Sequence, residues 1–344
     1  MRRALGACFS AFLILIGARP TTAHDPITTK ITFAREIRAI LAARCAVCHA
    51  PGGSAPMALT TYEEVRPWAR AIKDQVLTRR MPAWHAARGF GAFKNDPTLT
   101  PIEIAMIVSW VDGGLPFSSS SPRAPSTASA VGSASAPLVA AASRRKIGLP
   151  AVRIAAGAAD GSARVAARWV SGWSFEPGDP LITSATFSLA DGTLVGTWVA
   201  GDDGVMLPAD SAIRITPPLR VHLQRRLPAD YEERYKARAS VLRLVTRAKP
   251  PLRRVWTEQA SCGAPRSGRA AELIGVRPLL ADKESDRVWL ERPGAPKTII
   301  GWFRDFDPRF SRTYWLARSG DLPIDARLQG DAPCQLQLTV IARR

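Results

Sequence analysis

Two cysteines and a histidine lie within five residues of one another in the stretch ARCAVCHAPG. Three chemistries use thiols and an imidazole at this spacing: a zinc half-site, a redox-active dithiol and covalent haem attachment. A zinc site normally needs a second pair of ligands, and residues 24–117 contain no further cysteine. A redox dithiol of the thioredoxin type follows a strand, whereas a helical pattern precedes this motif. The pattern therefore favours a haem bonded to Cys45 and Cys48, with His49 as the proximal axial ligand of its iron.

A second axial ligand would have to come from the other face of the haem, and three side chains after the motif could supply it. Met81 is the first choice, because Pro82 favours an extended chain that could lay the thioether against the open face. Met57 and His85 remain open as alternatives. Met106 lies within a helical pattern, so we expect it to fill a core.

The motif is flanked by helical patterns. Apolar residues in TFAREIRAILAARC recur at helical spacing before it. Thr61 with Glu64 forms a capping box, and Thr100 with Glu103 forms another at the start of LTPIEIAMIVSWVDGG. We therefore expect an all-α domain over residues 24–117.

The N-terminus, MRRALGACFSAFLILIGARPTTAHD, has the features of a cleavable signal peptide over residues 1–23, with cleavage near Ala23. Its apolar stretch is too short to span a bilayer, and Cys8 precedes that stretch, which argues against a lipoprotein anchor. No later segment is apolar enough to cross a membrane. We expect a periplasmic or secreted protein.

The chain has a formal net charge of +18, carried mostly by arginine. A basic surface can attract nucleic acid, anionic lipid or an acidic protein. No basic run is long, so we expect the charge to be spread evenly, with no nucleic-acid ligand and a redox partner protein of acidic character.

Residues 118–146 are mostly Ser, Ala and Pro, which predicts a flexible linker. Short alternating runs follow, such as LRVHLQRRL and CQLQLTVIARR, separated by Pro, Gly and Asp. These runs predict a mainly β region with two sandwich lobes, over residues 147–249 and 250–344.

The remaining cysteines, Cys262 and Cys334, are the only distant pair once the first two belong to a local motif. An oxidising compartment permits a disulfide between them. Such a bridge closes a long loop, which would stabilise the fold by roughly 4 kcal/mol on the chain-entropy model.

FAREIRAILAARCAVCHAPG, MPAW and LTPIEIAMIVSWVDGG together resemble the class I cytochromes c over about residues 30–116. In that family, helices surround one covalent haem c. The resemblance implies that Cys45 and Cys48 are the thioether anchors, His49 the proximal ligand and Met81 the distal ligand. It also implies that three tryptophans line or cover the haem: Trp68, Trp84 and Trp110.

The C-terminal part resembles the copper type II, ascorbate-dependent monooxygenases of the peptidylglycine-hydroxylating type, which consist of two jelly-roll-like sandwiches. TLVGTWVAGDDGVMLPADSAIRITPPLRVHLQ and GWFRDFDPRFSRTYWLARSGDLPIDARL carry this resemblance. That family binds copper through several histidines, but the corresponding stretches LITSA and GVRPLLAD contain none. Only His222 matches a ligand position, as a vestige of the copper site. Copper needs several converging imidazoles, so we expect a scaffold without copper.

We therefore expect an exported monohaem c-type cytochrome that transfers single electrons, with one haem c and no catalytic residues. Its β region would serve docking or binding. Two alternatives stay open. The first is a haem-coupled copper-dependent monooxygenase, which stoichiometric copper in the purified protein would support. The second is a haem-based sensor or ligand-binding protein, which carbon monoxide binding would support.

Overall fold

The computed structural model describes most of the chain after the predicted signal peptide. About 40% of the described residues lie in strands and 16% in helices. The predicted signal peptide with its cleavage site near Ala23 and the predicted linker over residues 118–146 lie outside the described residues. The described ranges are 29–94, 96–117, 151–166, 168–202, 204–228, 236–266 and 268–343.

Short helices occupy the N-terminal part. They are the π-helical turn η1 (Phe33–Ile37), α2 (Arg38–Arg44), α3 (Tyr62–Val65), the 3-10 turn η2 (Arg66–Trp68), α4 (Ala69–Leu77) and α5 (Pro101–Asp112). Both predicted capping boxes are confirmed, at the first residues of α3 and α5. The helices pack around one buried apolar group, which we call the helical core; it includes Phe33, Leu41, Val65, Ile107 and Trp110.

The prediction of an all-α cytochrome c domain of class I is wrong. The described helices are few and short, and the longest has twelve residues. Between α4 and α5 the chain leaves the helices and follows the β region, where Ala86 forms a bridge with Phe303 and Phe93 a bridge with Leu316. Capping and periodicity indicate where a helix begins, but they do not indicate which surface the next segment packs against.

Three sheets are formed by the described residues after residue 150, and the largest has nine strands. Its order is β1-β9-β3-β7-β10-β16-β11-β14, with β6 paired to β3. The strands of this sheet are β1 (Ala151–Ile154), β3 (Arg168–Glu176), β6 (Val205–Met206), β7 (Ser211–Ile215), β9 (Ser240–Arg247), β10 (Arg253–Ser261), β11 (Ala271–Pro278), β14 (Tyr314–Leu322) and β16 (Gln335–Ile341).

Two smaller sheets pack on the large one, in the orders β2-β8-β4-β5 and β13-β12-β15. Apolar side chains from facing sheets share two cores, one on each half of the large sheet. The strands are β2 (Asp160–Ala163), β4 (Ile182–Ser188), β5 (Leu194–Val199), β8 (Leu219–Arg225), β12 (Asp286–Arg292), β13 (Ala295–Phe303) and β15 (Arg327–Gly330), and the 3-10 turn η3 spans Pro308–Phe310.

We call residues 151–249 the first lobe and residues 250–343 the second lobe. Each is sandwich-like, and the parallel pairing of β7 with β10, at Ser211–Arg253 and Ile213–Val255, joins them into one continuous sheet. The predicted fold class, an all-α domain followed by a separate β region, is therefore replaced by a mainly β protein with a small helical group.

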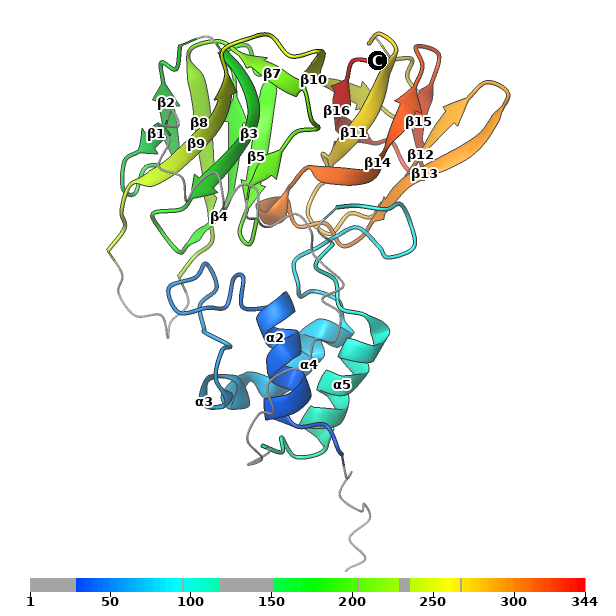
Figure 1. The fold of residues 1–344 in the computed structure, drawn as a ribbon. Helices are drawn as coiled ribbons and strands as arrows, with labels where there is room; N and C mark the ends of the chain where they lie inside the picture. The colour runs from blue at the N-terminus through cyan, green and yellow to red at the C-terminus, as the bar shows by residue number, and fades with distance from the viewer. Residues whose placement is uncertain are drawn as a thin grey trace, which may run out of the picture.

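The helices lie below both lobes, and the loops that follow α2 and α4 reach towards the strands (Figure 1). None of the helices in the described part of the chain is long and apolar enough to cross a membrane.

Candidate functional site

The cysteine–histidine motif forms one tight turn at the end of α2. The backbone N–H groups of Cys48 and His49 both donate to the carbonyl oxygen of Cys45, at 3.1 and 2.9 Å. Side chains three and four residues apart on such a turn lie on the same side of the chain. The turn therefore carries both thiols and the imidazole, but their ligand atoms do not all lie within 4.8 Å of one another.

The ring of His49 is held in a defined orientation and tautomer. Its Nδ1 lies 3.0 Å from the carbonyl oxygen of Met57. Because a carbonyl oxygen only accepts, Nδ1 carries the proton and Nε2 keeps its lone pair. Burial lowers the pKa of His49, so the ring is neutral at neutral pH. A neutral imidazole whose other nitrogen donates to a carbonyl is the usual form of a metal-ligating histidine.

Neither cysteine has the environment of a reactive thiolate. Burial raises the pKa of Cys45 to about 12, and the nearby Cys48 adds to this effect. Burial also raises the pKa of Cys48, although the charge of Arg312 acts against it. Redox-active dithiols depend on a lowered thiol pKa. The two thiols are protonated, which argues against a thioredoxin-type function.

The motif lies between the helices and the first lobe. Cys45 packs against the helical core, whereas Cys48 packs against the core of the first lobe. Gly201, in the turn after β5, permits this approach: its φ is +93°, and a Cβ atom there would lie 3.0 Å from Cys48 Sγ.

Arg312 connects the surroundings of the motif, and the sequence analysis missed it. Its side chain bonds Asp202 Oδ1 in the first lobe at 3.0 Å and the carbonyl oxygen of Ala83 at 3.4 Å. Its guanidinium also lies 5.3 Å from the centre of the Trp84 ring. Arg312 and Asp202 are 110 residues apart, and no spacing pattern in the sequence links them.

The three candidates for a second axial ligand occupy different places. Met81 follows α4 and is 40% exposed. Met57 packs against the helical core, and its carbonyl lies on the Nδ1 side of the His49 ring, away from Nε2. His85 packs against the second lobe, with its ring 5.2 Å from that of Phe306. Burial, assisted by the charge of Arg312, lowers the pKa of His85 to about 4.

The tryptophans expected beside a haem belong to two different apolar cores. Trp84 is buried in the second lobe, where its ring lies 4.8 Å from that of Tyr314. Trp110 is buried in the helical core and donates to the carbonyl oxygen of Pro116, and Trp68 packs at the edge of that core. Core packing accounts for Trp110 and Trp68 without a ligand.

Two buried donors next to the motif have no acceptor. Trp84 Nε1 and Arg312 Nε are both buried without a hydrogen-bond partner in the part of the chain that the structure describes. Arg312 interacts electrostatically with Cys48, and its guanidinium lies over the Trp84 ring. Buried N–H groups are rarely left unpaired, so these two donors are available to an acceptor.

His222 belongs to no group of three potential metal ligands among the described residues. It lies on β8 with its side chain exposed, and its Nδ1 is 2.6 Å from Asp160 Oδ1. Among the described residues, the only group of three potential metal ligands is Cys262, Asp286 and Cys334. Two of these form a disulfide that joins the chain after β10 to the chain before β16, with a Cα–Cα distance of 5.1 Å. The predicted disulfide between these two distant cysteines is confirmed.

Fold and site together define a mainly β protein that presents a Cys-Ala-Val-Cys-His turn between a small helical group and a β lobe. No known family model matches the chain, and no curated protein matches it. The resemblances to class I cytochromes c and to copper monooxygenases are therefore not upheld.

Proposed function

We propose that the protein carries one covalently attached haem on Cys45, Cys48 and His49 and transfers single electrons. The observation that carries this proposal is the hydrogen bond from His49 Nδ1 to the Met57 carbonyl, beside two protonated thiols on the same turn. This hydrogen bond leaves the lone pair of His49 Nε2 free to ligate iron, as the histidine of a CxxCH motif must.

The donor set and its surroundings fit a haem. Both cysteines are free, so each thiol remains available to form a thioether with a vinyl group of the haem. The unpaired donors Trp84 Nε1 and Arg312 Nε have the right chemistry for propionate carboxylates. When bound, the haem supplies an iron centre that changes between two oxidation states by one electron.

The residues of this chain would determine how that centre behaves. The Met57 carbonyl orients the His49 ring and raises the basicity of Nε2. Met81 is the proposed distal ligand, because its side chain is 40% exposed, whereas the Met57 side chain packs against the helical core and the His85 ring packs in the second lobe. A thioether would favour ferrous iron and raise the reduction potential.

Export and a protein partner complete the proposal. The signal-peptide pattern over residues 1–23 and the Cys262–Cys334 disulfide both support an oxidising compartment, the periplasm or the exterior. The electron would pass to or from a partner protein of acidic character, since the chain is strongly basic. The β lobes would support docking.

The test is to express the full chain, with its signal peptide, in a host that attaches haem to exported proteins. Haem that stays with the polypeptide on a denaturing gel would support the proposal. The double variant Cys45→Ala/Cys48→Ala should lose this haem, whereas the control Cys262→Ala/Cys334→Ala should keep it. Wild-type protein that folds without bound haem would refute the proposal.

The distal ligand can be tested separately by the absorption spectra of three variants. Met81→Ala should lose the methionine–iron band and keep the covalent haem, whereas Met57→Ala and His85→Ala should keep both. Loss of the ligand signature only in His85→Ala would transfer the assignment to that residue and refute the role of Met81.

A further inference from the structure

Four arginines gather around two tryptophans on one face of the large sheet; we call this surface the arginine face. Trp169 on β3 pairs with Arg214 on β7, and Arg254 follows on β10, the next strand of the sheet. Trp256 lies two residues further along β10. The arginines are Arg214, Arg247, Arg254 and Arg269. Arg168 directly precedes Trp169 on β3, so its side chain leaves the opposite face of the sheet.

The indole rings hold several of these arginines in place. The guanidinium groups of Arg214 and Arg254 lie 5.4 and 5.5 Å from the centre of the Trp169 ring. Arg269 lies 4.6 Å from the centre of the Trp256 ring. Stacking on a ring face leaves the N–H edges of a guanidinium free to bind, and it reduces the side-chain entropy that binding would cost.

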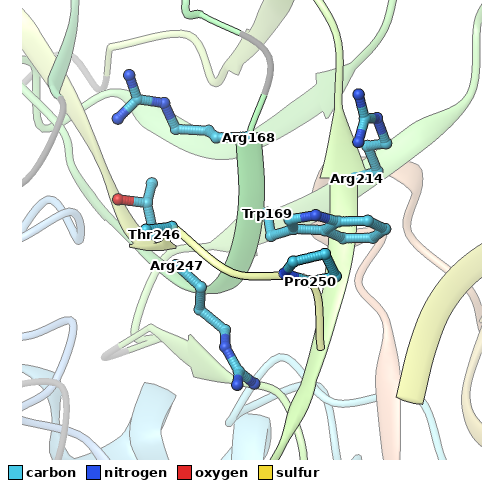
Figure 2. A pocket seen from close by; sticks show the side chains of 7 residues that line it. Arg168, Trp169, Arg214, Thr246, Arg247 and Pro250 are labelled. Atoms are coloured by element: carbon cyan, nitrogen blue, oxygen red, sulfur yellow. The ribbon is translucent and has the colours of Figure 1, made fainter. Parts of the chain in front are cut away.

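The surface is hollowed at this point. One hollow of about 470 Å³ is lined by Arg168, Arg214, Arg247, Trp169 and Pro250. Figure 2 shows Arg214 and Pro250 beside the Trp169 ring and Arg168 pointing away from it. A second, of about 400 Å³, is lined by Arg254 and Arg269. The hollows adjoin, because Arg254 lines the second and stacks on the tryptophan of the first.

Most of the charge on this face is unpaired. None of the four arginines forms an ion pair with a carboxylate among the residues that the structure describes. Arg343, which also lines the second hollow, pairs with Asp321. Arginines just outside the face are paired, as Arg253 is with Glu272 and Arg266 with Glu258. Adjacent cations of one sign produce a local potential that attracts an anion with several charges.

We propose that the arginine face binds an anionic polysaccharide that carries carboxylate or sulfate groups along its chain. Guanidinium groups bind such oxyanions in bidentate geometry. The Trp169 ring is buried beneath two arginines, so it has no free face on which a nucleobase could stack. Leu252, 85% exposed, is the one large apolar side chain strongly exposed on this face, and a protein interface would need a larger apolar centre.

The position of the face suits an anchoring role. The labelled strands β7 and β10 lie at the end of the lobes away from the helices (Figure 1). A polysaccharide bound there would leave the Cys45–His49 turn accessible. The inference does not depend on the haem and goes beyond the proposed electron transfer.

The test measures binding of the full-length protein to heparin and to polygalacturonate at several salt concentrations. Arg214→Gln/Arg254→Gln should weaken binding about tenfold or more, because two charge-assisted contacts are lost. The control Arg287→Gln/Arg309→Gln removes the same charge from exposed arginines that are paired with aspartates, and it should leave affinity within about twofold.

Equal circular dichroism spectra for the two double variants would show that both fold. Binding of neither polysaccharide by wild type would refute the proposal. An equal loss of affinity in both double variants would also refute it, because the effect would then reflect net charge alone. Tighter binding of DNA or polyglutamate than of either polysaccharide would assign the face to another class of partner.

Discussion

Replacing Arg312 by methionine should destabilise the protein, because one side chain joins three parts of the fold. Arg312 is only 9% exposed, and it bonds Asp202 in the first lobe while its guanidinium lies over the Trp84 ring. Methionine keeps much of the apolar volume but removes the charge and all donors.

The magnitude follows from the contacts that are lost. A hydrogen bond between charged groups contributes about 1.5–3 kcal/mol, and a partly desolvated cation–π contact about 1–2 kcal/mol. The Asp202 side chain is 28% exposed and still accepts a bond from the Val199 N–H at 2.9 Å, so the lower values apply. We expect the free energy of unfolding to fall by about 2.5–3 kcal/mol.

The assay is urea unfolding followed by circular dichroism, with Arg309→Met as the matched control. Arg309 pairs with Asp307, but its side chain is 55% exposed, so its loss should cost under about 1 kcal/mol. If Arg312→Met is no less stable than Arg309→Met, Arg312 does not join the lobes as described.

Three further predictions concern stability and the approach of the helices to the first lobe. Cys262→Ala/Cys334→Ala opens a loop of 72 residues and should lower the free energy of unfolding by about 4 kcal/mol, measured by denaturant titration; a loss below about 1 kcal/mol would contradict the chain-entropy argument. Burial raises the pKa of Asp286, so its stabilising contribution is complete at low pH and is lost as pH rises through the folded-state pKa. Asp286→Asn should therefore gain stability relative to wild type as pH rises above about 4, and a stability difference that stays constant with pH would refute this reasoning. Gly201→Val should push the turn away from Cys48 and increase amide hydrogen exchange there, whereas unchanged protection would show that the close contact is absent.

Local features of the fold could be predicted from the sequence. Thr61 and Thr100 cap helices because a hydroxyl and a glutamate three residues later satisfy the first backbone donors. Alternating apolar residues predict strands such as β8, in which the first side chains are alternately buried and exposed. The residues of the CxxCH motif are close in the chain and form one turn. Each of these signals depends on residues close in the chain.

Long-range features could not be predicted in the same way. The sequence places Trp84 in a helical domain, but its ring is buried in the second lobe against Tyr314, 230 residues away. Parallel pairing of β7 with β10 makes one sheet from two lobes, and no turn between these strands signals it. The bond between Arg312 and Asp202 likewise depends on the finished fold.

The arginine face shows the same limit for charge. A formal net charge of +18 without a long basic run indicates an even distribution. The sheet brings Arg214 and Arg254 onto one tryptophan from strands far apart in sequence. Composition describes total charge, whereas strand order determines where it accumulates.

The most direct test of the account is mass spectrometry of the peptide that contains Cys45, Cys48 and His49, from full-length protein secreted by a host able to attach haem. The account predicts one haem mass on this peptide, with neither thiol open to alkylation. An unmodified peptide in which both thiols are alkylated would contradict it.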